Sequence, residues 1–172
     1  WRIDTGPGGG VLQMSASDST HLSLAIARHH AVEAGHATDS LVAYGSEQAH
    51  SSIEKGARIA GYRHIRSIRV DESFALDVNA LKDQVEADLA SGLVPTWVCS
   101  AIGTTSTTAM DPIRLIAAVA KDHGMWHHAD AAYAGSAMIC PEFRNLQDGV
   151  ELVDSYTFNP HKRLLTNFDC SV

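Results

Sequence analysis

Short apolar runs alternate along this chain with segments that have helical periodicity. Helices are expected at residues 15–34, 51–60, 78–90 and 112–123, and strands at residues 41–44, 64–70, 96–102, 125–129 and 155–158. In the third of these helices, Leu81, Val85 and Leu89 recur every four residues, so they share one face. Strands that alternate with helices predict an α/β fold built on a mostly parallel sheet. Ligands of such sheets bind at the carboxyl ends of the strands.

Composition limits the classes of partner and compartment. The 172 residues are 45% hydrophobic and 19% charged, which is typical of one globular domain with a sizeable core. The net charge of −7 argues against nucleic acid or an anionic membrane as a partner. The three cysteines, Cys99, Cys140 and Cys170, follow no CxxC spacing, which favours a reducing, cytoplasmic compartment over a disulfide framework. No apolar run approaches the roughly 18 residues that a membrane span needs.

A lysine and an aspartate carry the most specific chemistry in the chain. Asp130 directly follows the expected strand 125–129, and Lys162 lies in the Asn-Pro-His-Lys segment 159–162. Because Pro160 disfavours a helical conformation at the residue before it, Lys162 is expected on a turn. A Schiff-base lysine and an aspartate that binds a pyridinium nitrogen are the minimum equipment for pyridoxal phosphate (PLP) chemistry. Taken singly, each residue also has an ordinary structural interpretation without catalysis, as a surface lysine or a turn aspartate.

Six segments resemble, in the same order, those of the group II PLP-dependent decarboxylases, and most closely the aromatic-L-amino-acid decarboxylases. They are residues 8–17, 48–52, 102–105, 128–135, 140–144 and 159–171. The resemblance implies the large domain of the PLP-dependent transferase fold type I. Residues 1–172 would form the central part of that domain. An N-terminal segment, the rest of the large domain and a C-terminal small domain would lie outside this chain, and the protein would be a homodimer.

The resemblance also implies roles for individual residues. Lys162 would form the Schiff base, Asp130 would bind the pyridine nitrogen, and His50 would stack on the ring and relay protons. The start of the first helix presents free N–H groups and serine hydroxyls, which suit a phosphate. The other implied cofactor contacts are phosphate ligands at Ser15, Ala16, Ser17, Ser155 and Asn159, a ring-hydroxyl contact at Thr105, packing under the ring at Ala132, and orientation of the cofactor by His161.

Two observations bear on competing interpretations. His127, His128 and Asp130 are close in sequence, but adjacent strand residues point to opposite faces, and no HExxH motif or cysteine cluster is present. No metal site is therefore expected. Arg163 stands where the family usually has Trp. A guanidinium there must stay hydrated or paired, so weaker packing is expected beside Lys162.

The activity implied by the resemblance is that of a PLP-dependent carboxy-lyase. It would convert an aromatic L-amino acid to the aromatic amine and CO2, with the groups that bind the substrate supplied from outside this chain. One alternative is an aromatic aldehyde synthase, although the presence of His50 favours the decarboxylase. The other alternative is a non-catalytic relative that keeps the fold, for which Arg163 is the one positive sign.

Overall fold

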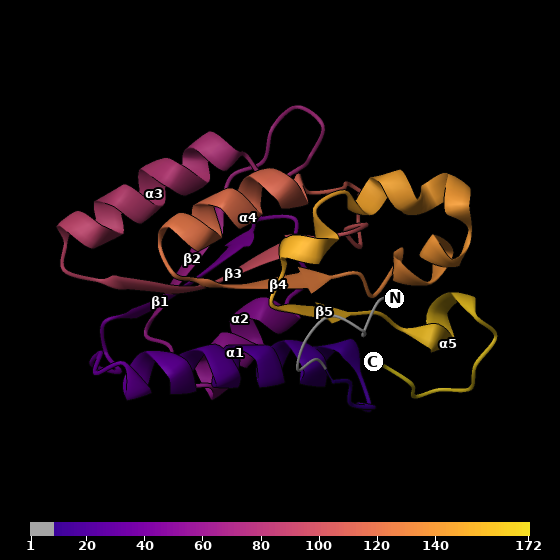
Figure 1. The fold of residues 1–172 in the computed structure, drawn as a ribbon, viewed down its shortest axis with the longest axis horizontal. Helices are drawn as coiled ribbons and strands as arrows, with labels where there is room; N and C mark the ends of the chain where they lie inside the picture. Colours follow the sequence, from indigo (N-terminus) through magenta and orange to yellow (C-terminus); the bar gives the residue numbers. More distant parts are fainter. Residues whose placement is uncertain (1–8) are drawn as a thin grey trace.

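The computed structural model describes residues 9–172, so Gly8 of the first matched segment lies outside the described residues. A five-stranded sheet runs through the centre of the molecule in the order β2-β1-β3-β4-β5 (Figure 1). Each strand pairs in parallel with its neighbours. The strands are β1 (Leu41–Ser46), β2 (His64–Ile68), β3 (Val94–Ala101), β4 (Trp126–Asp130) and β5 (Ser155–Thr157). The prediction of an α/β fold on a mostly parallel sheet is confirmed.

Four helices cover the two faces of this sheet. They are α1 (Ala16–Glu33), α2 (Ser52–Ile59), α3 (Val78–Ala90) and α4 (Ile113–Asp122). Figure 1 shows α1 and α2 on one face and α3 and α4 on the other. Each strand and helix begins and ends within two residues of the bounds predicted from periodicity, and α3 has the predicted bounds.

The strands contribute to both cores because their side chains alternate between the two faces. In β1, which is buried along its whole length, Val42 and Tyr44 pack into the core under α3 and α4. Leu41 and Ala43 pack into the opposite core, under α1 and α2. A parallel strand covered on both faces reads as a continuous apolar run rather than as an alternating one. That is the pattern found at residues 41–44.

Local chemistry sets the helix ends. The Ser15 hydroxyl accepts a hydrogen bond from the Asp18 N–H at 3.2 Å, which caps the start of α1. Asp77 caps α3 in the same way by accepting from the N–H groups of Asn79 and Ala80. After α1, Gly35 adopts a φ of +91°, a left-handed conformation that ends a helix at little cost.

The chain between β4 and β5 departs from the sequence expectation. It forms three 3₁₀ segments, η1 (Gly135–Ile139), η2 (Pro141–Gln147) and η3 (Val150–Leu152), none of which was predicted.

After β5, Lys162 lies in a single helical turn, α5 (Pro160–Arg163), rather than in an irregular turn. Asn159 is extended, with φ −110° and ψ 102°, as the following proline requires.

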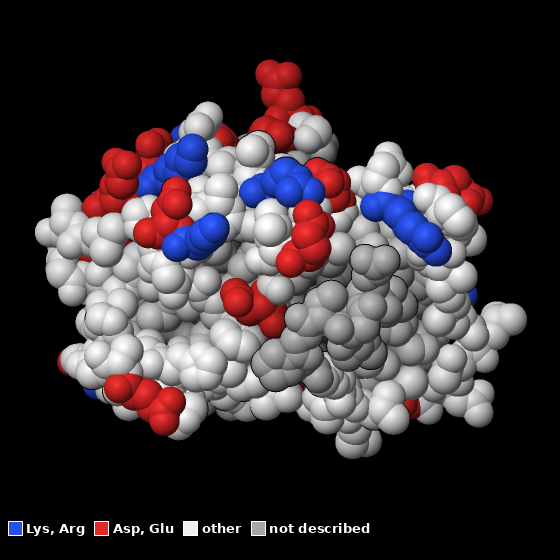
Figure 2. Space-filling model, in the orientation of Figure 1, with Lys and Arg blue, Asp and Glu red and all other residues white. Residues whose placement is uncertain are grey.

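On the face in Figure 2, lysine and arginine side chains lie beside acidic ones rather than in a basic patch. Among the ion pairs of the described residues, Arg114 is paired with both Asp148 and Glu151. Within the described residues, no helix combines the length and the apolarity needed to cross a membrane.

Candidate functional site

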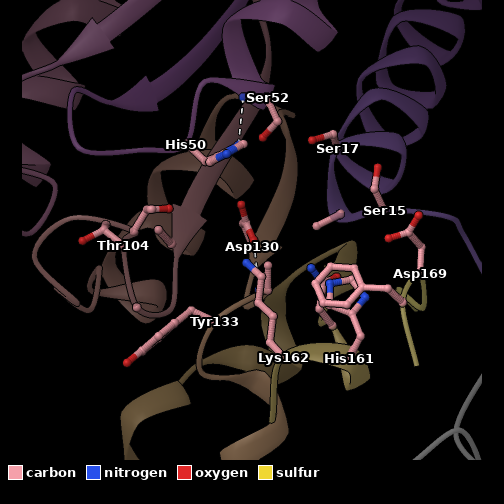
Figure 3. Close-up of a pocket in the computed structure, with 17 residues that line it drawn as sticks. Ser15, Ser17, His50, Ser52, Thr104, Asp130, Tyr133, His161, Lys162 and Asp169 are labelled. Carbon is pink, nitrogen blue, oxygen red and sulfur yellow. Dashed lines mark hydrogen bonds between the residues drawn. The ribbon is translucent and has the colours of Figure 1, made fainter. Parts of the chain in front are cut away.

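A cavity of about 220 Å³ lies at the carboxyl ends of the central strands, beside the start of α1. Segments that are distant in sequence meet there (Figure 3). Ten of the residues assigned a cofactor contact from the sequence line it: Ser15, Ala16, Ser17, His50, Thr105, Asp130, Ala132, Asn159, His161 and Lys162. The parallel topology explains the meeting, because every parallel strand ends at the same edge of the sheet.

Asp130, the last residue of β4, presents a carboxyl group to this cavity. Its Oδ1 accepts a hydrogen bond from the Ala132 N–H at 3.0 Å. Burial raises the pKa of Asp130, whereas the hydrogen bond from the Ala132 N–H and the positive charge of Lys162 act in the opposite direction. The site therefore holds a carboxylate whose ionised form gains from any further cation placed against it.

Lys162 lies in α5, the helical turn that follows β5, and lines the cavity. Its backbone N–H donates to the Asn159 carbonyl at 3.1 Å, and the Ser136 hydroxyl donates to the same carbonyl at 3.2 Å. Figure 3 shows the lysine side chain extended toward Asp130. Within residues 9–172 its amine has no hydrogen bond or ion pair. The amine is thus available for reaction.

His50 lies on the loop between β1 and α2, and its ring orientation is fixed by the backbone. The Ser52 N–H donates to His50 Nδ1 at 3.1 Å, so the neutral ring carries its hydrogen on Nε2. In the view of Figure 3, Asp130 lies between His50 and Lys162. The ring is exposed, which leaves its face open to a planar ligand.

The start of α1 forms the polar end of the cavity. The Ser15 hydroxyl donates to the Asp18 carboxylate at 2.8 Å, so capping already occupies that hydroxyl, whereas Ser17 is exposed. The first N–H groups of a helix have no partner inside the helix, and they bind anions well. Asn159 Oδ1 is buried and lacks a hydrogen-bond partner among the described residues. Asn159 and the start of α1 therefore border one cavity.

The cavity wall that follows β3 contains Gly103, a position where a side chain would not fit. Gly103 has a φ of +86°, and a Cβ atom there would lie 2.7 Å from Cδ1 of Tyr133. Thr104 bonds to Thr107 Oγ1 at 2.7 Å and accepts from the Ala109 N–H at 3.0 Å. Because Thr104 is occupied by its own loop, the exposed Thr105 is the threonine left for a ligand hydroxyl.

Ser155 is the one assigned residue that does not line this cavity. Its hydroxyl accepts from the Trp126 indole N–H at 2.8 Å and bonds to His128 Nδ1 at 2.8 Å. Ser155 is the first residue of β5, in register with His128, whereas the cavity lies at the other end of the strand. It lines a larger, mostly apolar cavity beside β5 instead.

His127, His128 and Asp130, which are close in sequence, do not come together as metal ligands. His127 bonds to Ser100 Oγ at 2.9 Å, whereas His128 stacks on Trp97 with ring centroids 5.9 Å apart. The two rings thus lie on opposite faces of the sheet, as strand geometry predicts. In the part of the chain that the structure describes, no group of three His, Cys, Asp or Glu side chains could hold a metal ion.

Seven residues that line the cavity were given no role from the sequence: Ser52, Ala101, Gly103, Thr104, Tyr133, Phe168 and Asp169. Most lie within segments already matched to the family, but no role had been assigned to them. Proximity to a site residue was the available signal. Tyr133 is three positions beyond Asp130, and Ser52 is two beyond His50.

Comparisons with known proteins agree with this geometry. Residues 2–172 match a family described as "Pyridoxal-dependent decarboxylase conserved domain". Aromatic-L-amino-acid decarboxylase from Bos taurus is 46% identical over 98% of this chain and 36% of its own length. Phenylacetaldehyde synthase from Arabidopsis thaliana is 45% identical over 99% of this chain and 36% of its own length.

A solved structure shares the fold closely. The Oryza sativa TDC, crystallised with PLP and tryptamine, superimposes with a TM-score of 0.94 at 43% identity. The match covers 96% of this chain and 36% of the rice chain. The present chain thus spans about a third of the length of the relatives that it matches.

Proposed function

Because the chain belongs to the pyridoxal-dependent decarboxylase family, we propose that the full-length protein decarboxylates an aromatic L-amino acid to its amine and CO2. The carrying observation is that Lys162 and Asp130 meet at one cavity beside the start of α1. The names of the relatives support an aromatic substrate, since they include an aromatic-L-amino-acid decarboxylase and a structure with tryptamine.

The residues of the cavity fit PLP as the cofactor. Asp130 offers a carboxylate suited to a protonated ring nitrogen. Because burial raises the pKa of Asp130, a cation beside it would stabilise the ionised form. Ala132 is small enough to lie under a flat ring. The first turn of α1 suits a phosphate, and Asn159, which lines the same cavity, has a side-chain NH2 that can donate to one.

When bound, PLP supplies an electron sink for the electron pair left on the α-carbon as CO2 departs. The protein residues prepare that chemistry. Lys162 contributes the primary amine for covalent attachment, and no ion pair within residues 9–172 competes for it. Asp130 would keep the ring nitrogen protonated. His50 would contribute an aromatic face and relay a proton through Nε2.

The proposal extends to the organisation of the whole protein. Residues 1–172 would be the central part of the PLP-binding large domain, and further segments would complete the substrate pocket. The active protein would be a homodimer in the cytoplasm. The three cysteines are free thiols, which supports a reducing compartment.

An aromatic aldehyde synthase is the second candidate, and it is favoured by the 45% identity to phenylacetaldehyde synthase. Product analysis separates the two activities. The full-length protein is incubated with PLP and with tyrosine, tryptophan or dihydroxyphenylalanine, in air and without oxygen. The proposal predicts CO2 and the amine in equal amounts in both atmospheres. Aldehyde and hydrogen peroxide formed only in air would establish the synthase, and absence of any CO2 release would contradict both.

A further inference from the structure

We propose that Arg163 is a positioning residue whose contact with Tyr133 holds the Lys162 turn against the segment that carries Asp130. The proposal rests on the proposed function, since it concerns the placement of the amine that would bind PLP. Both Tyr133 and Lys162 line the cavity (Figure 3). Arg163 directly follows Lys162 and is the last residue of α5.

Arg163 makes two contacts with the same residue. Its guanidinium carbon lies 4.1 Å from the centroid of the Tyr133 ring, within the range of a cation–π contact. Its Nε–H donates to the Tyr133 carbonyl at 3.2 Å. The guanidinium is therefore paired and stacked, which replaces the expectation of weaker packing at this position.

The turn that carries Lys162 depends on such contacts. A helix of four residues gains too little from its own hydrogen bonds to be stable alone. Two links join it to the segment after β4. Ser136 bonds to the Asn159 carbonyl at its start, and Arg163 contacts Tyr133 at its end. Lys162 lies between these two links.

The far side of Tyr133 is also constrained. Its ring packs so closely on Gly103 that a Cβ atom there would lie 2.7 Å from the ring. The tyrosine therefore lies between the end of β3 and the guanidinium of Arg163. Through this stack, the Lys162 turn is held against the ends of β3 and β4. Strand β4 also carries Asp130.

The contact also explains how arginine can occupy a position where an aromatic residue with an N–H donor is usual in the family. A guanidinium offers a flat face for the tyrosine ring and an N–H for its carbonyl. Tryptophan offers the same two groups. Leucine offers neither, and lysine offers a cation without the flat, forked donor.

The test is hydrogen exchange, followed by mass spectrometry, on the full-length protein without added cofactor. Arg163→Leu is expected to speed exchange roughly fivefold in peptides spanning residues 159–165, with β1 and β3 unchanged. Arg163→Trp is expected to exchange like the wild type, and Arg163→Lys to be intermediate. Arg144→Leu is the matched control, because Arg144 also donates to backbone carbonyls, those of Met138 and Ile139, but lies outside the cavity.

Coupling to Tyr133 sharpens the test. Once Tyr133→Leu has removed the ring, Arg163→Leu is expected to add less than half of its effect in the wild-type background. Unchanged exchange at residues 159–165 in Arg163→Leu, or faster exchange spread evenly over the protein, would overturn the proposal. Because this readout needs no cofactor, the role of Arg163 and the proposed PLP chemistry can fail independently.

The same variants can then be compared with PLP. The positioning role predicts that Arg163→Leu lowers kcat and speeds loss of PLP by roughly tenfold each, with KM for the amino acid little changed. Arg163→Trp should restore both values. A rise in KM alone would assign Arg163 to substrate binding and overturn the positioning role.

Discussion

Asp130 is the residue whose chemistry is most dependent on what the cavity holds. Burial raises its pKa, and the counteracting groups are one backbone N–H and the charge of Lys162. A pyridinium nitrogen would supply the missing cation. The carboxylate would in return keep that nitrogen protonated, which is what an electron sink requires.

Asp130→Asn is therefore expected to impair turnover more than cofactor binding. The amide keeps the size of the side chain but cannot hold a proton on the ring nitrogen by charge. In the full-length protein, kcat should fall on the order of 100-fold or more, while PLP occupancy at saturation changes little. Occupancy is measured by absorbance and turnover by CO2 release. Wild-type turnover at saturating PLP would reduce Asp130 to a structural role.

Most residues assigned a cofactor contact from the sequence line one cavity, whereas Ser155, whose placement depends on strand register, does not. The strand starting at Ser155 was predicted, but the sequence does not show that this strand pairs with β4 so that the Ser155 hydroxyl bonds to His128. Thr104 and Thr105 are adjacent and chemically equal. Only the loop geometry shows that Thr104 is already bonded to Thr107.

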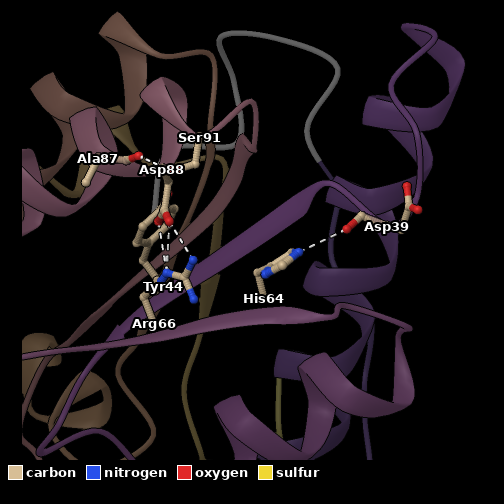
Figure 4. Close-up of polar contacts among 7 residues, drawn as sticks. All are labelled: Asp39, Tyr44, His64, Arg66, Ala87, Asp88 and Ser91. Carbon is tan, nitrogen blue, oxygen red and sulfur yellow. Dashed lines mark hydrogen bonds and ion pairs between the residues drawn. The ribbon is translucent and has the colours of Figure 1, made fainter.

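At the scale of elements, a buried polar cluster ties α3 to the sheet (Figure 4). Asp88 on α3 accepts from Tyr44 of β1 at 3.0 Å and from Nε of Arg66 of β2 at 3.0 Å. Burial by itself would raise the pKa of Asp88, but the hydrogen bonds from Arg66 and Tyr44 outweigh it and hold the pKa below its usual value. The carboxylate is thus kept ionised at only 3% exposure.

Asp88→Ala should accordingly be strongly destabilising. It leaves the Tyr44 hydroxyl without its acceptor in the core and Arg66 without its anion, a loss of about 3 kcal/mol. The melting temperature of the full-length protein is the measurement. Asp83→Ala, on the exposed side of the same helix, is the control and should change stability by less than about 0.5 kcal/mol. Equal melting temperatures for the two variants would show that the cluster does not stabilise the fold.

The interior strand β4 contains two buried histidines that make the fold sensitive to acid. Burial lowers the pKa of His127 to about 4 and that of His128 to about 3, with the His127 charge a further cause for His128. The unfolded chain, with ordinary pKa values near 6.5, takes up these protons first as the pH falls. Stability contributed by neutral burial is therefore complete above pH 6.5, and it is lost progressively toward pH 4 and pH 3.

His127→Gln should remove part of this pH dependence. Between pH 7 and pH 5, the wild type should lose about 2 kcal/mol more than the variant in the free energy of opening of β3 and β4 amides. Hydrogen exchange at the two pH values gives that free energy. The exposed His36→Gln is the control and should behave like the wild type. The same pH slope in all three proteins would mean that His127 is not buried in the neutral form.

Element prediction succeeded where periodicity was strong and failed where packing decides. The four long helices have apolar faces at helical spacing and recognisable caps, so their bounds follow from the chain itself. The 3₁₀ segments have no such period. They follow from close packing, as at Gly135, where a Cβ atom would lie 2.6 Å from Cβ of Phe158. Contacts between residues 23 positions apart cannot be read from a local pattern.

The molecule as a whole is a scaffold that brings four distant segments to one sheet edge. The start of α1, the loop after β1, the end of β4 and the turn after β5 converge on a cavity of about 220 Å³. The family resemblance named these segments, but only the parallel order β2-β1-β3-β4-β5 explains why they meet. The central claim is that this convergence makes Lys162 the attachment point for PLP.

Borohydride reduction of the full-length protein with PLP tests that claim most directly. Reduction fixes the cofactor on the lysine that holds it, and peptide mapping by mass spectrometry identifies the residue. One modified peptide is expected, carrying the label on Lys162, and no covalent label is expected in Lys162→Ala even though some PLP still binds. Stoichiometric label on any other lysine, such as Lys55 or Lys121, or label retained in Lys162→Ala, would contradict it.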